Sequence, residues 1–190
     1  MYKVKGKPWA YSGAIDVSDC ATAKEVMLKA GLNFNVAKCE LVGKMPIKLT
    51  GTDEELDRII KEQKEGAHVF GTDIYRKCDN AFATYRTDYN IPLGVVKSKY
   101  TIVQNNDAFN FFDDAIGKNS AIWQTAGFWG NGERIFVSAK LPNNILVKGD
   151  PVENYLVFTN THDGSSGVKI LFTPIRIVCE NTLTSAINTS

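Results

Sequence analysis

The sequence predicts an α+β fold, in which a mainly antiparallel sheet carries helices on one face and a small helical part precedes it. Apolar residues recur at helical spacing in residues 18–31, 52–66 and 105–117, whereas most segments after residue 80 alternate or are rich in β-branched residues. Short turn sequences separate those later segments, as antiparallel hairpins require. From residue 81 onward we therefore expect the order β-β-α-β-β-β-β.

The first two predicted helices precede the sheet. In residues 18–31 the apolar positions fall at i, i+3, i+4 and i+7, and Ser18 or Asp19 is the expected cap. In residues 52–66, Thr52 and Glu55 form an S/T-x-x-E capping box, and acidic residues crowd the first turn. Because few apolar residues follow, this second helix is expected on the surface.

The third predicted helix lies within the sheet region. In residues 105–117, Phe109, Phe112 and Ile116 line one face. Gly130-Asn131-Gly132 is the strongest hairpin signal, because Asn-Gly accepts the positive φ angles of a tight turn. The predicted strands cover residues 81–88, 93–104, 122–129, 133–141, 154–161 and 168–179.

Length and composition indicate one domain, or one domain and a small appendage. The chain has 190 residues, of which 44% are hydrophobic, and this is enough apolar surface for a substantial core. We place the division after the acidic helix, between an N-terminal helical or extended segment at residues 1–66 and a β-rich core at residues 67–190. The formal charge of +1 gives no global argument for nucleic acid. No segment reaches the roughly 18 apolar residues of a membrane span, so we expect no membrane partner and a cytoplasmic protein.

Cys179 ends an apolar run and directly precedes polar residues suited to starting a helix. A catalytic cysteine needs a base, and the only histidines are His68 and His162. His162-Asp163-Gly164 has the residues that a hairpin loop needs for its own turn. We therefore interpret Cys179 as a packed thiol, with an enzyme that uses Cys179 and His162 as a minor alternative. No catalytic residue, metal or cofactor is expected, because the sequence has no CxxC pair, carboxylate cluster or phosphate loop.

Cations and aromatic residues on the predicted strands indicate a surface for a polyanion. Lys97 and Lys99 share one parity on their strand, and Arg134 and Lys140 share one on theirs. Single-stranded nucleic acid is bound without sequence choice when cations contact phosphates and rings stack on bases. The predicted phosphate-binding residues are Arg86, Lys97, Lys99, Arg134, Lys140 and Arg176, and Trp129 at a hairpin tip is the predicted stacking residue. Alternatively, the tryptophans belong to the core and the lysines only keep an exposed face soluble.

Several stretches together resemble one known family. They are KPWAYSG, AGLNFNVAKCEL, YRTDYNIPLGVVKSKYTIVQNNDAFNFFD, TAGFWGNGERIFVSAKLP and YLVFTNTHDGSSGVKILFTPIRIVCENTL. This set is similar to the phage/plasmid-like protein family, which is built on a domain of unknown function and occurs in prophages, plasmids and phages. The resemblance implies a strand-to-helix junction at CENTL, with Cys179 packed inside and Asn181 or Thr182 as the cap. In outline, the family's β-rich core is also similar to phage single-strand annealing proteins.

These observations give two expectations for function. The first is a non-catalytic protein of phage or plasmid replication and recombination, which binds or anneals single-stranded DNA as a homo-oligomer in the cytoplasm of a bacterial host cell. The second, which the near-neutral charge favours, is a structural or protein-interaction module of a phage. Such a module is a virion component or a host-directed inhibitor that binds no nucleic acid.

Overall fold

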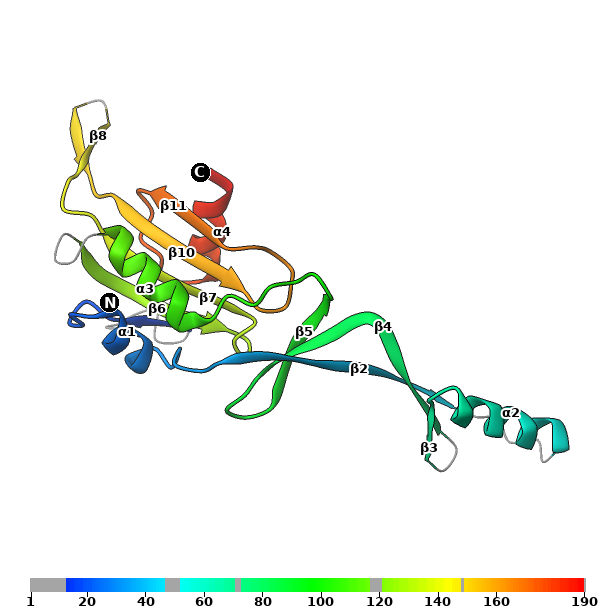
Figure 1. The fold of residues 1–190 in the computed structure, drawn as a ribbon. Helices are drawn as coiled ribbons and strands as arrows, with labels where there is room; N and C mark the ends of the chain where they lie inside the picture. Colours follow the sequence, from blue (N-terminus) through cyan, green and yellow to red (C-terminus); the bar gives the residue numbers. More distant parts are fainter. Residues whose placement is uncertain (1–12, 47–51, 71–72, 117–120, 148, 190) are drawn as a thin grey trace, which may run out of the picture.

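The computed structural model confirms an α+β fold with mainly antiparallel sheets (Figure 1). It describes residues 13–46, 52–70, 73–116, 121–147 and 149–189. The elements in chain order are β1 (Ala14–Asp16), α1 (Ala23–Lys29), β2 (Val36–Pro46), α2 (Asp53–Lys64), β3 (His68–Phe70), β4 (Asp73–Arg86), β5 (Ile91–Lys97), α3 (Asn105–Ile116), β6 (Ile122–Trp129), β7 (Arg134–Lys140), β8 (Ile145–Val147), β9 (Asp150–Val152), β10 (Tyr155–Thr161), β11 (Lys169–Thr173) and α4 (Glu180–Thr189).

The body of the protein is built on a sheet that we call the body sheet. Among the described residues it has five strands in the order β1-β6-β7-β10-β11, and all neighbours are antiparallel. The predicted hairpin joins β6 to β7, where Gly130 and Gly132 have φ angles of 64° and 115°. A Cβ at Gly132 would lie 2.8 Å from the ring of Phe34, so this position also requires glycine for space.

One face of the body sheet packs against α1 and α3, and the core cluster there includes side chains of β6, β7 and β10. Phe109 and Phe112 of α3 are fully buried in this core. The Phe112 ring lies 5.7 Å from the Trp123 ring and 6.2 Å from the Phe158 ring, measured between centroids. The predicted apolar face of the third helix therefore forms the centre of the core.

The other face of the body sheet packs against α4 and residues 174–179. Phe136 and Val157 of the sheet share a core cluster with Ile177 and Leu183. The sequence prediction placed helices on one face only, whereas the structure has helices on both. α4 was not predicted as an amphipathic helix because ENTLTSAINT is rich in Asn and Thr, which have low helix propensity.

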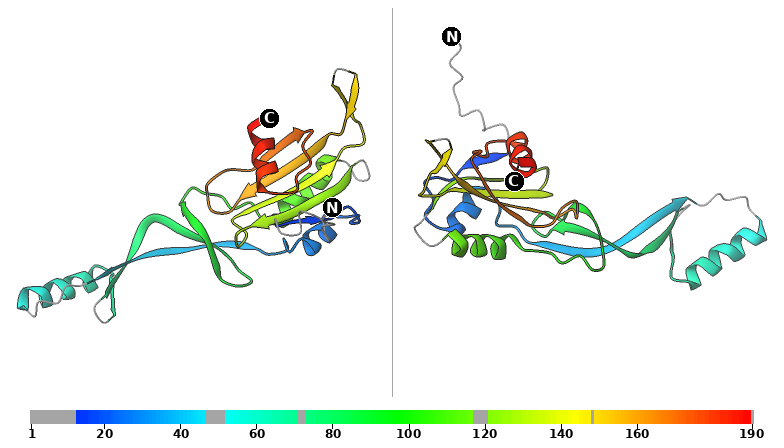
Figure 2. Two further views of the ribbon diagram at one scale, coloured as in Figure 1. Left: turned by 180° about the vertical axis from the view of Figure 1, so that it is seen from behind. Right: turned by 90° about the horizontal axis from the view of Figure 1, so that it is seen from above.

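β2, β3, β4 and β5 form a second sheet, the arm sheet, which projects from the body and carries α2 at its far end (Figures 1 and 2). β8 and β9 form a separate two-stranded antiparallel sheet. β4 is its central strand: β2 pairs along one edge of β4, and β3 and β5 pair along the other. The register changes after Glu40, where Leu41 of β2 faces residues 78–81 of β4, and Asn80 has a φ angle of 57°. The predicted acidic surface helix is confirmed, because α2 has no buried residue.

Two predicted strands end earlier than the sequence suggested. β5 ends at Lys97, and a turn in which the Tyr100 amide donates to the Lys97 carbonyl replaces the predicted continuation to residue 104. β11 ends at Thr173, and Pro174, which cannot donate to a strand ladder, begins an irregular segment.

The N-terminal part is integrated into both sheets. β1 pairs with β6 and β2 pairs with β4, so strands from residues 1–66 pair with strands from residues 67–190. Within the same part, the cap of α1 is Thr22 rather than Ser18 or Asp19, because the Thr22 hydroxyl accepts from the Glu25 amide at 3.3 Å.

We expect Phe112→Ala to lower the free energy of unfolding by about 3–5 kcal/mol, because it leaves a cavity between α3 and the body sheet. The matched control is Phe111→Ala on the same helix, which removes a ring that is 58% exposed and should change stability by no more than about 0.5 kcal/mol. Chemical denaturation of both variants measures this difference. Equal losses would contradict the assignment of the α3 face.

Candidate functional site

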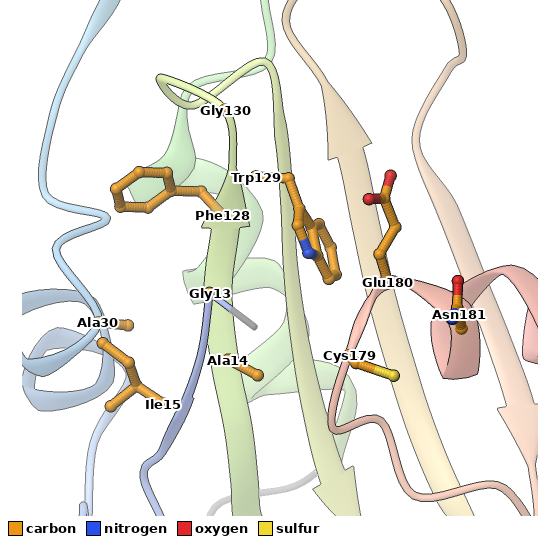
Figure 3. Close-up of a pocket in the computed structure, with 10 residues that line it drawn as sticks. All are labelled: Gly13, Ala14, Ile15, Ala30, Phe128, Trp129, Gly130, Cys179, Glu180 and Asn181. Atoms are coloured by element: carbon orange, nitrogen blue, oxygen red, sulfur yellow. The ribbon is translucent and has the colours of Figure 1, made fainter. Parts of the chain in front are cut away.

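A pocket of about 670 Å³ lies where the start of α4 approaches the end of β6. Its lining includes β1, the β6–β7 turn and residues 179–181. Trp129 forms one wall: its indole stacks on Phe136 with a centroid distance of 4.5 Å. Figure 3 shows the Trp129 indole on the side facing residues 179–181, whereas Phe128 points to the opposite side. Trp129 therefore packs partly into the core and is only half-available for stacking on a ligand.

Cys179 lies in this pocket at the start of α4, with a partly exposed and unoxidised thiol. The Thr182 hydroxyl accepts hydrogen bonds from the amides of Val178 and Cys179, both at 3.0 Å. The family resemblance implied Asn181 or Thr182 as the N-cap, but α4 begins at Glu180 and Cys179 holds that position. Thr182, the third residue of the helix, instead reaches back with its hydroxyl to the amides that precede it. The backbone N–H of Thr182 and then its hydroxyl hold the pKa of the Cys179 thiol below its ordinary value.

The structure does not place His162 as a base for Cys179. His162 is fully buried where the arm meets the body, with its Nε2 2.9 Å from Asn105 Oδ1 and its ring against Phe34. Burial lowers its pKa to about 4, so the imidazole is neutral at physiological pH. Within the described residues, no group of three or more His, Cys, Asp or Glu side chains could hold a metal ion.

Arg86 has a structural position. Its residue is 8% exposed, and its guanidinium lies 3.9 Å from the centroid of the Phe34 ring. Two of its nitrogens donate to the carboxylate of Asp88 at 3.1 and 2.7 Å, and a third donates to the Asn131 carbonyl at 2.9 Å. Because its nitrogens already donate to these partners, the guanidinium cannot bind a phosphate through two parallel hydrogen bonds.

Two other predicted cations of the body, Arg134 and Lys140, are paired with acidic residues, whereas Arg176 lies in the irregular segment between β11 and α4. Arg134 lies 3.6 Å from the carboxylate of Glu180, and Lys140 forms an ion pair with Glu153. The pKa of the Glu153 carboxyl lies below its ordinary value, mainly because of Lys140 and to a smaller extent because of Arg176. Arg134 and Lys140 occupy opposite ends of β7.

Lys97 and Lys99 lie on the arm and the turn that follows it. Both are exposed, and neither has an ion pair among the residues that the structure describes. Lys99 lies beyond the end of β5, so the parity argument holds only for Lys97. The structure therefore distributes the predicted phosphate ligands over two sheets and does not bring them together in one groove.

The exposed outer face of the arm sheet was not expected from the sequence. Cys39, Ala83 and Val95 lie directly opposite one another on β2, β4 and β5, so their side chains share one face. Cys39 is exposed and Val95 is 58% exposed. The inner face instead packs on the body, where the buried Thr84 hydroxyl donates to the His162 carbonyl at 2.6 Å. The outer face consists of Ala37, Cys39, Ala81, Ala83, Tyr85, Pro92, Val95 and Lys97.

Comparison with known proteins identifies a family that matches half of the chain. Residues 92–190 match the family described as Domain of unknown function (DUF932), which includes β5 and the body from α3 to α4 but not β2, α2, β3 or β4. No curated protein and no solved structure matches the chain. In the described part of the chain, no helix has both the length and the apolar character needed to cross a membrane.

We expect iodoacetamide to alkylate Cys179 faster than Cys20 at neutral pH. The lowered pKa of Cys179 increases its thiolate fraction there, whereas burial raises the pKa of Cys20. Thr182→Val should slow the reaction of Cys179 because it removes the hydroxyl, and Thr182→Ser should preserve the rate. Mass spectrometry of timed samples measures both, and the difference between the thiols should shrink as pH rises and both ionise. Faster labelling of Cys20, or no effect of Thr182→Val, would contradict this account.

Proposed function

Because the chain belongs to the DUF932 family, whose description names no activity, we propose its function from the geometry: a non-catalytic interaction module that assembles with further copies of itself. The observation that carries this proposal is the arm sheet. The part of its inner face around Thr84 packs on the body, while Cys39, Pro92 and Val95 of its outer face are exposed. Large exposed apolar patches in proteins are typical of interaction sites.

The shape of the arm supports a protein partner. A projecting sheet cannot cover its own outer face, and a sheet with exposed apolar side chains is stabilised when a second layer or a further strand joins it. A second copy of this chain supplies a surface with the same composition. Isologous contacts between identical patches are the commonest form of homo-oligomer.

The distribution of charge also supports a protein partner over a polyanion. Arg86, Arg134 and Lys140 all form ion pairs within the chain. A phosphate would have to displace these carboxylates before it could bind. Pairing reduces the positive potential that a nucleic-acid surface uses to attract its ligand.

We expect the purified protein to sediment as a species heavier than the 21.0 kDa chain, with a mass that rises with protein concentration. Adding an oligothymidylate should leave this assembly unchanged under the primary proposal. Sedimentation velocity over a concentration series, with and without the oligonucleotide, gives both results. A species that stays monomeric at every concentration would overturn the assembly module.

Binding of single-stranded DNA is the second candidate function, and one observation favours it. Lys97 and Lys99 are exposed cations without an ion pair in the described part of the chain. Exposed cations of this kind supply the phosphate contacts of a single-strand binding surface. In this candidate the protein is a phage or plasmid replication or annealing factor of the bacterial cytoplasm, as the sequence resemblance suggests.

If this second function holds, Lys97→Ala combined with Lys99→Ala should weaken DNA binding and flatten its salt dependence. Two lost contacts to single-stranded phosphates should reduce the slope of log K against log salt by about 1.4. Lys140→Ala, which removes a cation already paired with Glu153, is the matched control and should keep the slope. Fluorescence anisotropy with a labelled oligonucleotide measures the slopes, and no binding at about 50 mM salt would remove this function.

A further inference from the structure

β2 is a long edge strand. It spans Val36–Pro46, and within the described residues its only strand partner is β4. An edge strand presents a row of backbone N–H and C=O groups that can pair with a further strand. Figures 1 and 2 show β2 running away from the body along the side of the arm.

The backbone contacts show which residues of β2 point to the free edge. The Asn35 carbonyl accepts from the Thr87 amide, so the group at position 35 faces β4. The Val36 amide and carbonyl instead bind the Gln104 side chain, at 3.0 and 2.8 Å, so position 36 faces away from β4. Backbone groups alternate sides along a strand. The even positions from Lys38 to Pro46 therefore face outward.

The irregularity in the arm does not disturb this alternation. Glu40 pairs with Phe82, and the next pair is Val42 with Lys77. One residue of β2 separates these pairs, whereas residues 78–81 of β4 separate them on the other strand. The extra residues therefore belong to β4, and β2 remains a regular strand. Val42 lies at the middle of the outward row and is 49% exposed.

The charges on the outward row restrict how two copies can pair. Isologous pairing of two identical strands is antiparallel about a two-fold axis. Axes through Lys38, Glu40 or Lys44 place like charges directly opposite each other, which is unfavourable. An axis through Leu41 is also unfavourable, because it places Lys38 opposite Lys44. An axis through Gly43 pairs no residue with one of the opposite charge.

Two axes match opposite charges, and one of them allows the longer ladder. An axis through Cys39 places Lys38 opposite Glu40, but the Gln104 side chain already occupies the edge at Val36 and ends the ladder there. An axis through Val42 places Glu40 opposite Lys44 twice and uses the whole row away from Gln104. Pro46, which lacks an N–H, then falls at the end of the ladder.

The axis through Val42 also continues ion pairs that each arm already contains. Within one chain, Lys44 pairs with Asp73 and Glu40 pairs with Lys77. Placing Glu40 of the second copy beside Lys44 creates a row of alternating charge across four strands: Asp73 and Lys44 of one copy, then Glu40 and Lys77 of the other. The two-fold axis repeats this row on the other side of Val42.

We propose that β2 pairs with β2 of a second copy, antiparallel and centred on Val42, so that two arm sheets form one continuous sheet. This inference rests on the proposed self-assembly and identifies its surface. The occupant is a second copy of this chain, because its edge alone repeats the matched charges. The pairing also joins the two outer faces side by side.

Val42→Pro tests the edge. Proline removes the outward N–H at position 42 and places its ring at the free edge of β2. It leaves the hydrogen bonds to β4 in place, because the Val42 amide points away from that strand. We expect Val42→Pro to sediment as a 21.0 kDa monomer with an unchanged circular dichroism spectrum. Val42→Thr, which keeps the N–H and the β-branched shape, is the matched control and should remain assembled.

Cysteine cross-linking tests the register. In a chain with its four native cysteines replaced by serine, Val42→Cys should form a disulfide-linked dimer under mild oxidation. Directly opposite residues of a hydrogen-bonded antiparallel pair have Cα atoms about 5.5 Å apart, which is within the range that a disulfide spans. A chain that retains Cys39 alone should not cross-link, because the axis places Cys39 opposite Met45.

The outcomes separate this inference from the proposed function. An assembled wild type with a monomeric Val42→Pro and a cross-linked Val42→Cys supports both. If the wild type assembles but Val42→Pro assembles equally well, or if Cys39 cross-links in place of Val42→Cys, this interface is overturned while the assembly function stands. A wild type that is monomeric at every concentration overturns both, and the charges on β2 then act to prevent edge pairing.

Discussion

The contact of Arg86 with Phe34, Asp88 and the Asn131 carbonyl sets the relation between the arm and the body. Arg86 ends the central strand of the arm, whereas Asn131 lies in the turn between β6 and β7 of the body. A guanidinium this buried is stable only when its donors and its charge are all satisfied. The contacts that satisfy the Arg86 guanidinium therefore fix the arm sheet at the edge of the body core. The inner face of the sheet packs there, and the outer face stays exposed.

This constraint explains why the interaction surfaces lie on the arm. Near the body, the hydrogen-bonding groups of the arm already have partners: the Thr84 hydroxyl donates to the His162 carbonyl, and the Val36 backbone binds the Gln104 side chain. Beyond Val36, β2 leaves the body and keeps one free edge. Pairing of that edge with a second copy would extend the sheet without disturbing the junction. The exposed apolar row from Cys39 to Val95 would then become part of a wider face.

The elements with strong local signals could be predicted from the sequence. The aromatic spacing of residues 105–117 predicted α3, and Gly130-Asn131-Gly132 predicted the β6–β7 hairpin, because both signals depend on neighbours in the chain. β2 was missed, because it carries charged residues on an exposed strand without clear alternation. For α4 only the start was expected, from the junction at CENTL, because the residues that follow have low helix propensity.

The candidate site could be predicted less well, because its ion pairs join residues that are distant in sequence or lie across strands. Parity on a strand identified Arg134 and Lys140 as sharing a face, but it could not show that Glu180 and Glu153 pair with them. Likewise, the pattern around Arg86 gave no sign that Phe34, about fifty residues earlier, would cover the guanidinium. The free edge of β2 is a property of sheet order, which no local pattern of residues specifies.

Amide hydrogen exchange along β2 tests the central claim most directly, because it reads the outward backbone groups themselves. We expect the amides of Glu40, Val42 and Lys44 to exchange slowly at high protein concentration and rapidly on dilution. The inward amides that face β4 should keep their protection throughout. Rapid exchange of the three outward amides at every concentration, in a protein that is otherwise folded, would contradict the pairing of the arms.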